Sequence, residues 1–438
     1  MSDSTTGDLL FYSEGKQVWD RTHTIMANGD SLAGNNHTFI QSSLIVPTVG
    51  QADQYYLFTS EMMGEYQIGG LDVFSLHYSV VDMRRNNGLG EVSMKNQQLF
   101  DSLGRTITAI PFADQEGYWL IATKTEDEHC FVVWPITSDG IGIPKNQCTG
   151  LGPINTAFSI NGRMKPSPDG QMLALTRWQF ESAPFYLFRF NDTTGAVADP
   201  LVVSNLSAQN GLSFSPDSKQ LYLSAYDSTS LTENQSSQRH VVHQFAVNDY
   251  DSVAISQSLT ATSIRDFNSV TDLQLGLDGQ LYGITRTPSD GEAHSTFLAV
   301  IQEPNMANFD SPIQVRSLED RREEYTHFPN FMQHYFQQER IQVPTVPGDG
   351  EGNDPCDPSL AIRLFPNPTT TQINISVREG CFNSYVLRII AATGQVLGKS
   401  LAIDDTETTV AIPSLAAGVY LAELRFSDRA VVKKFIVR

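Results

Sequence analysis

The 438-residue chain lacks several features that would assign it to a common functional class. No run approaches the 18 or so apolar residues that a membrane-spanning helix needs, so we predict no membrane span. Only 29 Lys and Arg stand against 49 Asp and Glu, a net charge of -20. Phosphate binding requires basic patches, so this balance argues against nucleic acid as a partner.

The linear signatures of common enzymes are also missing. The chain contains no Gly-x-Ser-x-Gly, no His-Glu-x-x-His, no Walker loop and no dinucleotide-binding fingerprint. These absences favour a protein that is not an enzyme. The alternative is an enzyme whose residues converge from distant loops.

The acidic excess lies entirely in residues 1–358, because residues 359–438 carry 9 Lys and Arg against 6 Asp and Glu. Solubility explains most of this excess, and cation binding is the alternative. Glu61, Glu65 and Asp72 lie in a glycine-containing stretch whose oxygens could bind calcium. They lack a regular Asp-x-Asp-x-Asp spacing, so they are weak metal candidates beside solvated loop charges. We predict no other cofactor.

Four cysteines allow two disulfides in an extracellular protein. Cys130 and Cys148 lie on what read as consecutive strands, and Cys356 and Cys381 bracket the start of the last segment. Four free, buried thiols are the alternative.

Strand patterns dominate the chain, and three of them repeat. The copies are Met164–Leu175, Leu212–Leu223 and Leu273–Ile284, each a strand, a tight turn and a second strand. Asp169, Asp217 and Asp278 fall in these turns at intervals of 48 and 61 residues, the size of a four-stranded propeller blade. Pro pre-sets such turns, Asp accepts backbone N–H bonds and Gly supplies a positive φ.

Looser copies upstream bring the number of blade-like modules to about six. We therefore predict an all-β protein with a six- to seven-bladed β-propeller over residues 1–340. Thr326–Phe331 could add one more blade strand. Residues 341–358 are rich in Pro, Gly and acid and predict a linker. Residues 359–438 form short strands that fit a small Ig-like sandwich.

The last segment also carries short phrases in a set order. Their residues are Pro366, Asn367, Pro368, Gly394, Gly418, Tyr420, Lys433 and Lys434. The series resembles the C-terminal sorting domain of proteins exported by the type IX secretion system of Bacteroidetes. The resemblance implies that the secretion machinery is a partner, and that the protein is secreted or lies on the outer cell surface. An ordinary edge strand blunted by lysine is the alternative for Lys433 and Lys434.

Two resemblances concern the propeller. The Ser-Pro-Asp-Gly turn resembles that of WD40-like propellers of bacteria. Longer phrases, among them Leu10–Gly15, Gln41–Pro47 and His77–Met83, resemble the N-terminal propeller of Bacteroidetes surface proteins associated with gliding motility. That family has further strands before the first phrase. The resemblance therefore implies that Met1 is an internal methionine and that a signal peptide and an initial strand precede it.

These observations lead to three functional hypotheses. We favour a non-enzymatic surface or secreted propeller that binds a protein or glycan. Trp19, Trp119, Trp134 and Trp178 could stack on a sugar, although aromatic residues in blades more often lie in the core. A hydrolase with scattered site residues is the second hypothesis. The third is a subunit that self-associates into a surface layer or filament.

Overall fold

The computed structural model describes most of the chain. The described residues are 1–2, 8–35, 41, 43–68, 71–124, 130–151, 162–176, 182–207, 209–226, 240–262, 269–276, 278–286, 296–309, 313–317, 327–333, 362–365, 369, 372–377, 384–391, 396–403, 407–411, 415, 418–426 and 430–437. The chain divides into two compact units. One is Met1 with Leu10–Ile341, and the other is Gln342–Arg438 with Ser2–Leu9.

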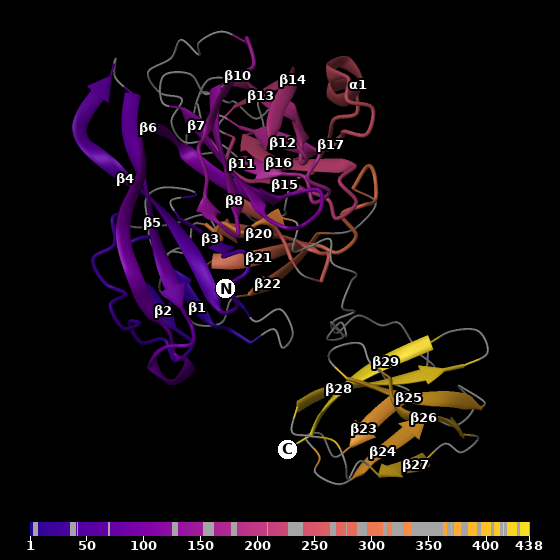
Figure 1. The fold of residues 1–438 in the computed structure, drawn as a ribbon. Helices are drawn as coiled ribbons and strands as arrows, with labels where there is room; N and C mark the ends of the chain where they lie inside the picture. The colour runs from indigo at the N-terminus through magenta and orange to yellow at the C-terminus, as the bar shows by residue number, and fades with distance from the viewer. Residues whose placement is uncertain are drawn as a thin grey trace. The chain divides into compact units, whose positions relative to one another are not determined.

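The first unit is a β-propeller built from antiparallel strands (Figure 1). Its strands are β1 (Phe11–Ser13), β2 (Val18–Asp20), β3 (Ser43–Pro47), β4 (Gln54–Ile68), β5 (Leu71–Asp82), β6 (Glu91–Pro111), β7 (Tyr118–Lys124), β8 (Cys130–Thr137), β9 (Gly140–Ile141), β10 (Lys145–Cys148), β11 (Met164–Pro166), β12 (Met172–Leu175), β13 (Ser182–Asn191), β14 (Ala196–Ser207), β15 (Leu212–Phe214), β16 (Gln220–Tyr226), β17 (His240–Ala246), β18 (Thr260–Thr262), β19 (Ser269–Leu275), β20 (Leu281–Arg286), β21 (Thr296–Ile301) and β22 (Ile313–Ser317). Among the described residues α1 (Ser252–Gln257) is the single α-helix, and Asp251 caps its first turn.

The strands form groups of four, with the short strand β9 added to one of them. The groups are β3–β6, β6–β10 with β9 paired beside β8, β11–β14, β15–β18 and β19–β22, preceded by the two-stranded sheet β1–β2. Strand β6 belongs to two groups, because its first half pairs with β5 and its second half pairs with β7. The predicted number of six or seven blades stays a prediction.

Hydrophobic clusters lie between neighbouring groups. One joins β11–β14 to β15–β18 through side chains such as Phe185, Phe214 and Phe245. Another joins β6–β10 to β11–β14, where Phe131 and Phe188 meet edge to face with ring centroids 5.0 Å apart. The sheets therefore pack face to face in chain order, as in a propeller.

The repeated turns have the geometry that the sequence predicts. The Asp169 carboxylate accepts the Gln171 amide at 3.0 Å, and Gly170 has a φ of +72°. In the second copy the carboxylate of Asp217 accepts the Lys219 amide at 3.2 Å, and Ser218 takes the glycine position at a φ of +62°. These turns lie at one end of the propeller, which we call the turn end. The loop end is the opposite end, where the first strand of each group begins.

The second unit contains two antiparallel sheets around one core. The strands are β23 (Ile362–Phe365), β24 (Gln372–Val377), β25 (Tyr385–Ala391), β26 (Val396–Ile403), β27 (Glu407–Ala411), β28 (Gly418–Arg425) and β29 (Ala430–Val437). The sheet orders are β23-β24-β27 and β26-β25-β28-β29. Ile373 and Ile375 of the first sheet pack with Leu387 and Leu424 of the second. The Ig-like topology stays a prediction.

Within the described residues, no helix has the length and apolar character needed to cross a membrane.

Candidate functional site: the polar axis of the propeller

The first strands of the groups surround the axis of the propeller. Strand β6 contacts both β3 and β11, and β15 contacts both β11 and β19. The polar residues of these inner strands therefore face one another across the axis. This arrangement makes the axis the first place to look for a functional site.

Residues 327–333 are hydrogen-bonded to two inner strands, β19 and β6, at the loop end. The Phe328 amide donates to Asp272 Oδ2 at 2.7 Å, and Asn330 Nδ2 donates to the Ile107 carbonyl at 2.9 Å. We predicted a blade strand at Thr326–Phe331. The structure assigns no strand to residues 327–331, because their polar groups bond to inner strands instead of forming a ladder. Thr326 lies outside the described residues.

Gln41 joins this arrangement from the segment before β3. Its side-chain amide accepts the Met164 amide at 2.9 Å and donates to the Met164 carbonyl at 2.7 Å. It also donates to Asn330 Oδ1 at 3.2 Å. A buried glutamine thus takes the place of a neighbouring strand at the start of β11.

A buried ion pair lies at the same level of the axis. Arg163 Nη1 and Asp272 Oδ1 are 3.0 Å apart, and both side chains are only 2% exposed. The other guanidinium nitrogens donate to the carbonyls of Asn210 and Thr271. Burial lowers the pKa of Arg163, and Asp272 opposes that shift. The network holds three strand groups together with charge-assisted hydrogen bonds.

Lys165 lies on β11, two residues after Arg163. Its ammonium donates to Gln274 Oε1 at 2.7 Å and is fully buried. Burial lowers the pKa of Lys165 to about 8, Asp272 raises it, and Arg163 lowers it further. The axis therefore contains two cationic side chains and one carboxylate at close quarters.

We did not single out Arg163, Lys165 or Asp272 from the sequence. The sequence repeat nevertheless contains information about this network. When its first and third copies are aligned, Lys165 and Gln274 occupy equivalent positions, and so do Arg163 and Asp272. Both aligned pairs bond across the axis. Equivalent positions of propeller blades meet at the centre, so charged residues at such positions predict an axial network.

A second polar group lies on one face of the β4–β5 hairpin. Glu61 pairs with Ser75, and Thr59 pairs with His77, so these four side chains share a face. Among the described residues, His77 Nδ1 and Ser75 Oγ are buried and find no hydrogen-bond partner, and the same holds for Asn35 Nδ2 nearby. Burial lowers the pKa of His77, and Glu61 raises it. This group contains a base, a hydroxyl and a carboxylate.

The predicted calcium candidates are only partly described. Glu61 is exposed beside this group, but the side chains of Glu65 and Asp72 lie outside the described residues. Within the described residues, no three His, Cys, Asp or Glu side chains are placed to hold a metal ion. The calcium site stays a prediction.

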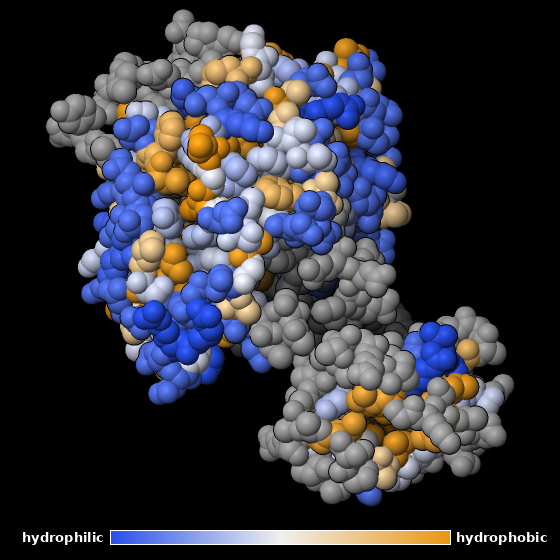
Figure 2. Space-filling model, in the orientation of Figure 1, coloured by the Kyte–Doolittle hydropathy of each residue, from blue (hydrophilic) through white to orange (hydrophobic). Residues whose placement is uncertain are grey.

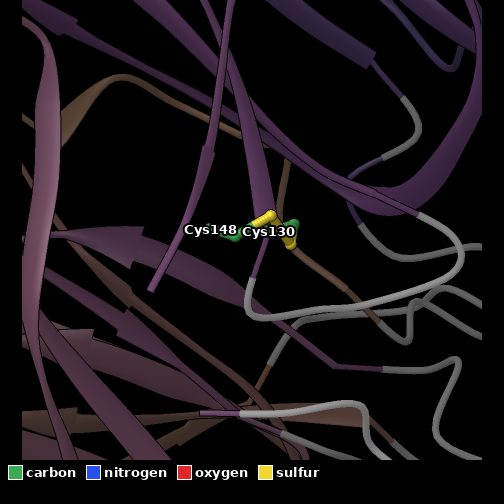
Figure 3. The surroundings of a disulfide bond; sticks show 2 residues. All are labelled: Cys130 and Cys148. Atoms are coloured by element: carbon green, nitrogen blue, oxygen red, sulfur yellow. A yellow bond between two sulfur atoms is a disulfide. The ribbon is translucent and has the colours of Figure 1, made fainter. Parts of the chain in front are cut away.

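Cys130 of β8 and Cys148 of β10 form a disulfide (Figure 3). The two residues are directly opposite in the ladder, so the bond ties the edge strand β10 to its neighbour. Cys356 and Cys381 lie outside the described residues.

Replacing Cys130 and Cys148 together with Ala is expected to lower the free energy of unfolding by about 3 kcal/mol, because the bond closes a loop of 18 residues. Urea unfolding measures the loss. A reducing agent should destabilise the wild-type protein equally and leave the double variant unchanged. If reduction destabilised both proteins alike, the effect would not come from this bond.

The structure places half of the predicted sorting residues. Tyr420 is buried on β28 opposite Phe435, and Gly418 lies opposite Val437. Lys433 and Lys434 lie on the edge strand β29, where Lys433 is partly exposed. The remaining predicted residues, Pro366, Asn367, Pro368 and Gly394, lie outside the described residues.

The C-terminal segment matches a known family. Residues 363–438 match the family described as a secretion system C-terminal sorting domain. The second unit is therefore a sorting domain of the type IX kind, and the protein is exported to the cell surface or the extracellular space. Among curated proteins none matches the chain. The gliding-motility resemblance stays a prediction.

Several solved structures are similar in fold. Hydrazine synthase of Kuenenia stuttgartiensis has a TM-score of 0.40 and 12% identity over 73% of this chain and 95% of that chain. An α-L-arabinofuranosidase of Clostridium thermocellum has a TM-score of 0.33 and 9% identity over 64% of this chain and 94% of that chain. The β-propeller domain of the Trilobed protease of Pyrococcus furiosus has a TM-score of 0.31 and 7% identity over 90% of this chain and 96% of that chain. Function does not follow from likeness at this level.

Proposed function

We propose that this exported protein is a non-enzymatic binding protein whose propeller recognises a protein or a glycan outside the cell. The proposal rests on the hydrogen bonds and the ion pair between the side chains at the axis of the propeller. Asp272, the one carboxylate of this network, is held by Arg163, and Lys165 donates to Gln274, so the network presents no free carboxylate that could act on a substrate. Residues 327–333 also lie at the loop end of the axis. Recognition is therefore assigned to the outer surface.

An aromatic group on the first sheet offers a surface of this kind. Tyr12 and Trp19 stack across β1 and β2 with ring centroids 5.3 Å apart and planes 14° apart. His23 Nδ1 lies 3.2 Å from the Tyr12 hydroxyl. The rings are partly exposed, since Phe11 and Val18 fill the opposite, buried face of this sheet. Aromatic faces of this kind stack on the apolar face of a sugar ring.

The surface favours polar ligands over apolar ones. Figure 2 shows separate hydrophobic spots among hydrophilic residues on the visible face of the propeller. The chain carries a net charge of -20, which disfavours anionic polymers. We therefore assign a neutral glycan or a cationic protein segment as the ligand class.

Screening the whole protein against arrays of neutral glycans and of secreted proteins is expected to identify a ligand. If that ligand is a glycan, Trp19→Ala is expected to weaken binding about tenfold, which corresponds to about 1.4 kcal/mol, within the range for an aromatic contact. Titration calorimetry measures the affinity. Phe331→Ala, which removes another exposed aromatic side chain, is the matched control and should bind normally. Robust hydrolysis of a glycan or peptide, abolished by one substitution, would overturn the proposal.

A hydrolase is the second candidate, and the Glu61, Ser75 and His77 group favours it. In that case His77→Gln should abolish hydrolysis and leave the unfolding midpoint nearly unchanged. The burial of Ser75, only 1% exposed, disfavours it as a nucleophile and ranks this candidate second. Self-association stays a prediction that light scattering tests.

A further inference from the structure

The ammonium group of Lys165 has more donors than the protein satisfies. A lysine ammonium has three N–H donors. Across the described part of the chain, Gln274 Oε1 is the one acceptor within hydrogen-bond distance of Lys165 Nζ. Lys165 is 3% exposed, so bulk water does not supply the missing acceptors. Two buried N–H donors on a cation are therefore left for another group.

The neighbouring carboxylate is already occupied. Asp272 Oδ1 accepts the Leu273 amide at 2.7 Å and lies 3.0 Å from Arg163 Nη1. Asp272 Oδ2 accepts the Phe328 amide at 2.7 Å. Asp272 forms its ion pair with Arg163 and attracts Lys165 only at longer range. The two cations and one carboxylate therefore leave one positive charge in excess among the described residues of the axis.

The repeat explains why the protein itself supplies no second carboxylate here. The position of Lys165 is taken by Ser213 in the second copy and by Gln274 in the third. Both are buried and neutral, and the Ser213 hydroxyl donates to the Phe214 carbonyl. At the positions aligned with Lys165, the inner strands thus supply dipoles and no charge. An excess positive charge that is buried is costly, and pairing with an anion removes much of that cost.

We propose that the axis of the propeller binds one small monovalent anion, chloride or a carboxylate, held by the free N–H donors of Lys165 between β11 and β19. Both anions carry a single negative charge, and both can accept two hydrogen bonds from the ammonium group. The site is separate from the surface at Trp19, so the anion proposal stands independently of the ligand class proposed above.

Anion binding at this site should stabilise the folded protein, because the site exists only when three strand groups are assembled. At an anion concentration about a hundredfold above the dissociation constant, the unfolding midpoint is expected to rise by about 3 °C. The effect should be present at pH 6 and absent at pH 10. At pH 10 the amine, which lies beside Arg163 and Asp272, is neutral and no longer attracts an anion.

The test compares thermal unfolding of the full chain at constant ionic strength, with gluconate as the large reference anion. Sodium chloride and sodium formate are the two arms, and they distinguish a halide from a carboxylate. The matched variants are Lys165→Met and Lys219→Met. Lys219 is an exposed lysine at the turn end, so its loss removes the same charge away from the axis.

The proposal predicts that chloride or formate raises the midpoint of the wild type and of Lys219→Met but not of Lys165→Met. Lys165→Met should fold, because it removes a charge that burial disfavours. In crystals soaked in bromide, an anomalous peak should lie within hydrogen-bond distance of Lys165 Nζ. Equal anion responses in wild type and Lys165→Met, or a water in place of the bromide peak, would overturn it. Neither outcome bears on glycan binding at Trp19.

Discussion

Replacing Asp272 with Ala is expected to lower the free energy of unfolding by about 3–5 kcal/mol, the usual loss when one partner of a buried ion pair is removed. The variant leaves Arg163 and Lys165 together without a carboxylate, at side chains 2% and 3% exposed. It also removes the acceptor of the Phe328 amide. Urea unfolding at pH 7, followed by circular dichroism, measures the loss.

A matched control separates burial from charge. Asp199 lies 4.0 Å from Arg189, with side chains 72% and 54% exposed, and Asp199→Ala should change stability by less than about 0.5 kcal/mol. The double variant Arg163→Met with Asp272→Leu should recover most of the loss, because it leaves no unpaired charge from the pair. Equal losses for Asp272→Ala and Asp199→Ala would show that the axial pair does not hold the blades together.

Deleting residues 363–438 is expected to abolish export in a bacterium that has a type IX secretion system, because this segment is the sorting domain. The protein should then accumulate inside the cell instead of on the surface or in the medium. Immunoblots of washed cells and of the medium, with the wild-type chain alongside, measure the change.

Two smaller changes in the same domain make the test sharper. Lys433→Ala with Lys434→Ala alters the edge strand β29, and we expect it to reduce export strongly. Arg425→Ala removes a cation that is 52% exposed on the neighbouring strand β28 and should be exported normally. Normal export of the lysine double variant would show that the pair is an ordinary edge strand and that other parts of the domain are recognised.

The turns were predictable because their causes are local. Asp169 and Asp217 accept amides two residues ahead, so a window of a few residues contains the whole interaction. The repeat spacing then indicated stacked sheets, and the phrases around Tyr420 identified the sorting domain. Period and turn chemistry thus indicated the propeller, and the resemblance to a known family identified the sorting domain.

The axial network was harder to predict because its partners are far apart in the chain. Arg163 and Asp272 are separated by more than one hundred residues, and neither belongs to a known motif. Pairing them requires knowing that first strands share the axis. The strand expected at Thr326–Phe331 was wrong over residues 327–331 for a related reason. Strand propensity does not reveal that Asn330 and the Phe328 amide have acceptors on the inner strands.

Strand β6 has a mechanical consequence for a protein that works outside the cell. It runs from Glu91 to Pro111 as one strand. It is the last strand of the group β3–β6 and the first strand of the group β6–β10. The groups β11–β14 and β15–β18, in contrast, share one ladder pair, Ser207 with Tyr226, beside their packed side chains. Strand β6 joins its two groups by one continuous backbone and by ladders on both sides, so we expect these two groups to resist shear as one unit.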